Sequence, residues 1–181
     1  TDPADVAAAF DAELAAIEGT GAQVKHCSRE LRDPICHNTF RKIAAMDRLA
    51  EYLGSDAAEF YIPYLNHEYW RLREHSLQKA AEAIRMGGGD LLASQFDSKQ
   101  VDPAIGIMAA FALSGDKAGI KLARKALASD APELRRQAMH TLAKLEGTQA
   151  LAAIQDRLSK TEDELERTGC EEALLLIAES S

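Results

Sequence analysis

Apolar residues recur along this chain every 31 residues, a spacing that is too long for one helix and suits a pair of helices. One register of the repeat contains Leu65, Phe96, Leu127 and Leu158, and a second contains Ala80, Phe111, Leu142 and Ala173. Repetition at this spacing is typical of stacked helix pairs, because each pair needs its neighbours to bury its apolar face. The pattern therefore predicts a stack of helix pairs.

Turn residues divide the chain into eleven expected helices, one leading helix and five antiparallel pairs. The first is expected over residues 2–17, the fifth over 69–86, the sixth over 90–96 and the tenth over 148–158. Pro63 should interrupt the fourth helix, because proline lacks the N–H that a helix interior needs. Thr161 and Glu164 have the spacing of a capping box at the start of the eleventh.

Three consecutive glycines, residues 87–89, divide the expected stack into two parts. We expect a single helical-repeat domain over residues 1–181, with an N-terminal half over 1–86 and a C-terminal half over 90–181. Glycine has the widest backbone freedom of any residue. The glycine run is therefore interpreted as a hinge between the halves.

The amino-acid composition favours helices and limits the kinds of molecule that the protein is expected to bind. The 181 residues are 46% hydrophobic and include only five prolines, and the net charge is −8. An acidic chain repels phosphate backbones, so a nucleic-acid partner is not expected, whereas a protein with a basic or amphipathic surface would be attracted. No apolar stretch approaches the roughly 18–20 residues that cross a membrane, and no targeting peptide precedes Thr1. A cytoplasmic location is the default expectation.

One stretch carries a family resemblance. Residues 127–138, with Pro132 between the acidic turn and Leu134-Arg135, followed by 141–145, resemble the HEAT repeat of the bilin-lyase type. Leu72-Arg73 matches the same position without the proline. The resemblance covers about residues 55–179 and implies an all-α, right-handed α-solenoid of about five HEAT-like pairs plus an N-terminal capping helix. For function it implies mainly an adaptor or scaffold that binds another protein.

Two branches of this class are enzyme-like, and each has a sequence feature that can be looked for in this chain. Chromophore lyases hold a linear tetrapyrrole, and the aromatic residues near Trp70 could stack on such a planar ligand. The deoxyhypusine hydroxylase type holds two iron ions with several His-Glu pairs, and this chain has only His67-Glu68. No nucleophile elbow, phosphate loop or His-Glu-x-x-His run is present. We therefore expect no catalysis, no cofactor and no bound metal.

Five of the ten aromatic residues lie between Phe60 and Trp70, and this segment is the predicted binding site. Aromatic residues beside arginine commonly anchor protein interfaces. The alternative is that these rings only fill space around Pro63. The predicted partner-binding residues are Tyr61, Tyr64, His67, Tyr69, Trp70, Arg71, Arg73, Glu74 and His75.

Arg73 and Arg135 occupy equivalent repeat positions and have a structural interpretation as well. In it, each arginine pairs with the acid of its own turn, Glu68 or Asp130. Under this interpretation Arg73 would stabilise the repeat instead of contacting a partner.

A second group of residues, His26-Cys27 and Cys36-His37, is symmetric about the point between Leu31 and Arg32. A tight helical hairpin there would bring Cys27 near Cys36. Three alternatives stay open: a disulfide, a zinc site and two inert thiols. A disulfide would indicate an oxidising compartment such as the periplasm, and would support a third function class, a periplasmic inhibitor-type binding protein.

Overall fold

The computed structural model describes residues 2–34 and 38–180 as a stack of helices. Eleven α-helices lie within these residues, which confirms the predicted all-α solenoid. They are α1 (Pro3–Ala15), α2 (Thr20–Arg32), α3 (Thr39–Leu53), α4 (Ala58–Tyr61), α5 (Trp70–Ala83), α6 (Gly89–Ser94), α7 (Val101–Ser114), α8 (Ala118–Ala126), α9 (Pro132–Glu146), α10 (Leu151–Lys160) and α11 (Glu164–Glu179). None of them is long and apolar enough to cross a membrane.

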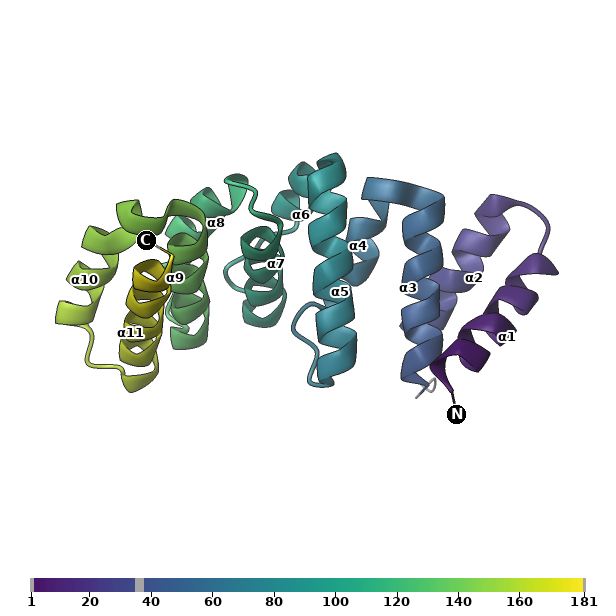
Figure 1. Cartoon of the computed structure of the whole chain (residues 1–181), viewed down its shortest axis with the longest axis horizontal. Helices are drawn as coiled ribbons and strands as arrows, with labels where there is room; N and C mark the ends of the chain where they lie inside the picture. Colours follow the sequence, from purple (N-terminus) through teal and green to yellow (C-terminus); the bar gives the residue numbers. More distant parts are fainter. Residues whose placement is uncertain (1, 35–37, 181) are drawn as a thin grey trace.

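The helices form two layers along an elongated molecule, with the termini at opposite ends (Figure 1). Helices α1, α3, α5, α7, α9 and α11 pack side by side, and we call them the odd-helix layer. The remaining helices form the even-helix layer behind it. In three of the pairs α2 packs on α3, α8 on α9 and α10 on α11. Each helix pair thus contributes one helix to each layer.

The 31-residue repeat places its second register in the core. Ala80, Phe111, Leu142 and Ala173 lie on α5, α7, α9 and α11, and all four are buried. Their periodic burial explains why the odd helices can stack. In the first register Leu65 and Phe96 are buried, whereas Leu127 and Leu158 are half-buried.

The second pair is irregular around Pro63, as expected. Helix α4 is a single turn between two 3₁₀ segments, Gly54–Ala57 and Ile62–Tyr64, and Pro63 lies in the second of these. The proline removes one backbone donor, so the chain tightens and turns instead of continuing as an α-helix. This turn places Tyr64 and the loop after it at one edge of the stack.

The glycine run lies in a close-packed turn. Gly87 has φ +104° inside the π-helical segment Ile84–Gly88, which joins α5 to α6. A methyl group on Gly88 would lie 2.8 Å from the Ser55 carbonyl oxygen, so glycine is needed there. Movement between the two halves stays a prediction.

The start of α11 differs from the expected capping box. The N-cap is Asp163, whose carboxylate accepts a hydrogen bond from the Glu166 N–H at 2.8 Å. Thr161 lies two residues earlier and donates its hydroxyl to the Glu166 carboxylate at 2.7 Å. The prediction that Thr161 and Glu164 form the box was wrong, because a carboxylate closer to the helix fills the capping position.

Candidate functional site

The predicted aromatic segment divides between two surfaces and the core. Tyr64, His67 and Tyr69 line a pocket at the edge of the stack, whereas Trp70, Arg71, Glu74 and His75 line a shallow hollow on the odd-helix layer. The division occurs at the start of α5, where neighbouring side chains of a helix point about 100° apart.

Tyr61 belongs to the core, so its prediction as a partner-binding residue was wrong. It is fully buried in α4, and its hydroxyl donates to the Met46 carbonyl oxygen at 3.2 Å. Burial raises the pKa of Tyr61 far above its usual range. For this residue, the alternative that the rings fill space near Pro63 is correct.

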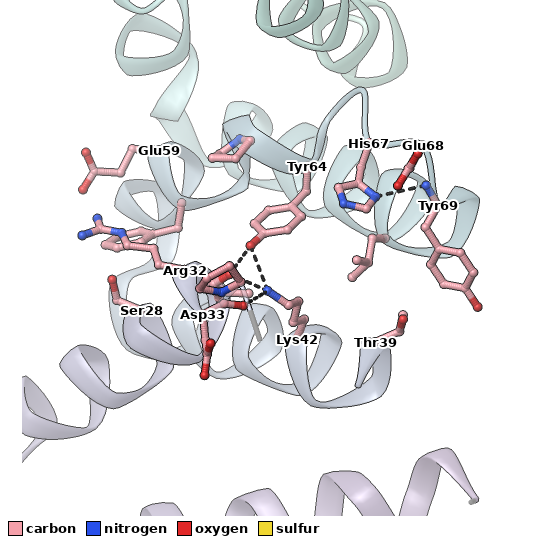
Figure 2. A pocket seen from close by; sticks show the side chains of 15 residues that line it. Ser28, Arg32, Asp33, Thr39, Lys42, Glu59, Tyr64, His67, Glu68 and Tyr69 are labelled. Carbon is pink, nitrogen blue, oxygen red and sulfur yellow. Dashed lines mark hydrogen bonds between the residues drawn. The ribbon is translucent and has the colours of Figure 1, made fainter. Parts of the chain in front are cut away.

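The edge pocket, about 550 Å³, lies between the end of α2, the start of α3 and the segment after α4 (Figure 2). Its polar and aromatic lining includes Lys42, Glu59, Tyr64, His67, Glu68 and Tyr69. Pockets of this size hold small ligands or a side chain of a partner.

Several groups in the edge pocket already bond to each other. The Leu31 carbonyl oxygen at the end of α2 accepts hydrogen bonds from the Tyr64 hydroxyl and from Lys42 Nζ, the latter at 2.7 Å (Figure 2). His67 Nδ1 accepts from the Tyr69 N–H at 3.0 Å, and the His67 ring stacks on Tyr64 with 5.7 Å between centroids. Lys42 and Tyr64 therefore cap α2, and the outer ring of Tyr69, 40% exposed, remains available.

The Trp70 patch, which we define as Phe40, Trp70, Arg71, Glu74 and His75, lies on α3 and α5 around a hollow of about 270 Å³. Trp70 is 53% exposed. The guanidinium carbon of Arg71 lies 5.2 Å from the Trp70 ring centroid and 5.7 Å from that of Phe40. Contacts of this kind between a cation and an aromatic face are attractive.

His75 forms the inner border of the Trp70 patch. Its Nε2 lies 3.0 Å from Asp47 Oδ1, and Lys79 Nζ lies 3.2 Å from the same oxygen. Burial by itself raises the pKa of Asp47, but the hydrogen bonds and charges of His75 and Lys79 outweigh it and lower the pKa. Asp47 therefore stays ionised and ties α5 to α3 beneath the patch.

Phe40 was missed because it lies outside the aromatic segment from Phe60 to Trp70 that the sequence predicts as the binding site. It is half-buried in the first turn of α3, directly after the N-cap Asn38. A first-turn position has no preceding turn to cover it, which is the signal that could have identified Phe40.

Arg73 points away from the Trp70 patch. Its guanidinium donates to the carbonyl oxygens of His67 at 2.6 Å and Glu68 at 3.3 Å. Its repeat equivalent Arg135 likewise donates to the carbonyl oxygen six residues earlier, at Ser129, at 2.8 Å. Arg73 is therefore structural.

The prediction that these arginines pair with the carboxylates of their own turns was wrong. Glu68 and Asp130 are exposed, and each arginine caps the backbone of its turn instead of a turn side chain. Arg135 pairs with a more distant acid, because its Nε lies 2.9 Å from Glu166 Oε1 on α11.

Cys27 is a free, buried thiol in α2, and burial raises its pKa to about 11. Cys36 and His37 lie outside the described residues, so the predicted pairings with them stay predictions. His26 Nδ1 accepts from the Arg29 guanidinium at 2.9 Å. Among the described residues no three His, Cys, Asp or Glu side chains gather as metal ligands would.

Comparison with known families identifies the repeat. Residues 89–175 match the family model of HEAT repeats. The matched residues are HEAT repeats. The matched HEAT repeats run from α6 into α11, and the same two-layer packing continues through the helices before them. No curated protein and no solved structure matches the chain.

Proposed function

We propose that this protein is a non-catalytic interaction module that binds another protein on its odd-helix layer, with the Trp70 patch as the anchor. The observation that carries the proposal is the exposed Trp70 beside Arg71, which lies near both the Trp70 and Phe40 rings. Tryptophan and arginine are enriched among residues that dominate binding energy. HEAT repeats, moreover, are commonly protein-interaction scaffolds.

The patch is prepared for binding before a partner arrives. The Arg71 guanidinium already contacts the Trp70 and Phe40 rings, and the interactions of His75 and Lys79 with Asp47 join the helices beneath. A side chain that is ordered in the free protein loses less entropy on association, so more of the contact energy appears as affinity.

The charges around the patch favour a basic or amphipathic partner. Glu74 is exposed on α5 and lines the same hollow as Trp70 and Arg71, and the whole chain has a net charge of −8. An apolar side chain of the partner would pack on Trp70, while a neighbouring lysine or arginine would meet Glu74. The long-range field would accelerate the encounter.

The proposal is tested by quantitative capture from a lysate of the source organism, with the parent chain and Trp70→Ala as baits. We expect at least one protein whose binding weakens about 30-fold with Trp70→Ala, the loss typical of a hot-spot residue. Because the Trp70 ring is half-exposed, the variant should keep its melting temperature within a few degrees.

Leu175→Ala is the matched control, since Leu175 is 64% exposed on α11 at the far end of the stack. It should leave capture within about threefold of the parent, as expected for a residue outside the interface. If every captured protein binds Trp70→Ala as well as the parent, the Trp70 patch is not the anchor.

The second candidate function, the handling of a planar ligand such as a linear tetrapyrrole, is favoured by the edge pocket. The ring of Tyr69 is 40% exposed at this pocket and could stack on such a ligand. Titration with a linear tetrapyrrole should then shift its absorbance spectrum with the parent and not with Tyr69→Ala. An unshifted spectrum with the parent would eliminate this candidate.

A further inference from the structure

A basic hollow lies beside α2, on a different surface from the Trp70 patch. It encloses about 670 Å³ between the end of α1 and the outer face of α2. Ile17 and Ala22 give it an apolar border, and Lys25, Arg29 and Arg32 line its length. These three cations, spaced four and three residues apart, share one face of the helix.

The three charges of the basic hollow are not neutralised. All three side chains are exposed, and none forms an ion pair among residues 2–34 and 38–180. The Arg29 guanidinium is fixed by its hydrogen bond to His26 Nδ1. Arg41, by contrast, is bound by the carboxylates of Glu13 and Glu30.

The uncompensated charge stands out in an acidic chain. Arg29 and Arg32 lie in the last turn of α2, where they also favour the helix dipole, but that interaction leaves their outer faces open to an anion. Asp33 is the single carboxylate among the described residues that line the hollow. In a chain with a net charge of −8, three unpaired cations on one face are unlike the average surface.

The hollow continues into the edge pocket. Ser28, Arg32 and Asp33 line both of them. A bound chain could therefore place carboxylates along Lys25, Arg29 and Arg32 and direct its next residues toward Tyr69.

We propose that the basic hollow binds an acidic segment of a partner protein in extended conformation, with its carboxylates on Lys25, Arg29 and Arg32. From Lys25 to Arg32 the helix rises about 10 Å. Side chains on one face of an extended peptide repeat about every 7 Å, so two or three alternating glutamates span this length. The Ile17 and Ala22 border receives their methylene groups.

A peptide fits better than a nucleic acid. The basic face is only two turns long, whereas a nucleic-acid strand continues its phosphates at short, regular intervals. Beyond Arg32 such a strand would meet Asp33 and Glu59 in the edge pocket. A peptide can place neutral residues there.

The test uses fluorescence anisotropy in low salt with labelled Glu-Ser-Glu-Ser-Glu and, as the uncharged probe, labelled Gln-Ser-Gln-Ser-Gln. The parent should bind the first peptide and not the second. Neutralising all three cations with Lys25→Gln, Arg29→Gln and Arg32→Gln should weaken binding about tenfold, because three exposed ion pairs are lost.

The matched control is the triple variant Lys117→Gln, Lys121→Gln and Lys125→Gln, in which Lys117 is the N-cap of α8 and the other two lie on that helix. These lysines are also exposed and spaced along one helix, so the change in net charge is identical. Peptide binding should stay within about twofold of the parent. Melting temperatures of both triple variants verify that they are folded.

Three results would overturn the proposal. They are no binding of the glutamate peptide by the parent, an equal loss in both triple variants, and tighter binding of an eight-residue oligothymidylate that depends on the same cations. The third result would assign the hollow to phosphate backbones instead. Trp70→Ala should bind the glutamate peptide like the parent, so failure here is separable from failure of the Trp70 patch.

Discussion

Consecutive residues at the start of α5 have different roles because each points about 100° away from the last. Trp70 and Arg71 face outward on the odd-helix layer, and Leu72 is buried. Arg73 then turns back to the carbonyl oxygens of the preceding loop. The proposed binding surface and a stabilising cap therefore lie within four residues, and of these four only Trp70 and Arg71 are suitable for substitution in a test of the Trp70 patch.

The Cys27 thiol should resist alkylation in the folded protein. It is fully buried, and burial raises its pKa to about 11, so only about one thiol in a thousand is ionised at pH 8. Treatment with iodoacetamide at pH 8, followed by trypsin and mass spectrometry, should leave peptide 26–29 unmodified without urea and modify it in urea.

The same digest tests the disulfide alternative, because peptide 26–29 carries Cys27 and peptide 33–41 carries Cys36. An unreduced digest that contains the two peptides joined would contradict the free thiol of Cys27. It would also favour an oxidising compartment.

The sequence could predict the burial of residues that repeat periodically. It could not predict the roles of residues that depend on the direction of a side chain. Ala80 and Phe111 repeat at the helix-pair spacing, so their burial could be predicted. The roles of Tyr61 and Phe40 could not be predicted, because a one-turn helix before Pro63 buries the first and a first-turn position leaves the second only half-buried. The basic hollow was missed because Lys25, Arg29 and Arg32 look like an ordinary solvated face until the end of α1 is placed beside them.

Helix α7 approaches the loop before α5 through Gly106. A methyl group at this position would lie 2.3 Å from Leu65 Cβ and 3.0 Å from the Leu65 carbonyl carbon. The backbone cannot yield as a flexible side chain would. We expect Gly106→Ala to lower the free energy of unfolding by about 2 kcal/mol, because overpacking outweighs the gain in helix propensity. Urea unfolding measures the change.

Gly21→Ala is the control for this prediction. Gly21 lies in α2, and a methyl group added there meets nothing within 4 Å. The higher helix propensity of alanine should then raise the free energy of unfolding by up to about 1 kcal/mol. Equal effects of the two substitutions would show that Gly106 is not a contact point.

An ion cluster around Glu166 joins α9, α10 and α11. Burial by itself raises the pKa of Glu166, but hydrogen bonds from Arg135, Arg157 and Thr161 outweigh it and lower the pKa to about 2. A carboxyl whose folded pKa is depressed stabilises the protein above its unfolded pKa near 4.5, and this contribution is lost as the pH falls toward 2. The loss amounts to about 3 kcal/mol at most.

Glu166→Gln should therefore be less stable than the parent at pH 7, and the difference should shrink between pH 5 and pH 2. Other carboxyls such as Asp47 titrate in both proteins, so comparison of the two unfolding curves isolates Glu166. A difference in unfolding free energy that stays constant with pH would contradict the role of its charge.

The two halves of the molecule are joined at residues 87–89. In a linear stack each helix pair contacts only its neighbours, so cooperativity depends on every junction. At residues 87–89 the junction is more than a flexible connection. Gly88 packs on Ser55, and Gly106 of α7 packs on Leu65 beside α5.

Because this junction is close-packed, we expect the parent chain to unfold in one transition. Trp70 is the single tryptophan and reports on the N-terminal half, whereas far-ultraviolet circular dichroism reports on all helices. The two signals should coincide in urea. Gly106→Ala should displace α7 from Leu65 and so remove a neighbour that stabilises α5. In this variant the Trp70 fluorescence transition should therefore separate from the dichroism transition. Separate transitions already in the parent would mean that residues 1–86 and 90–181 are independent folding units.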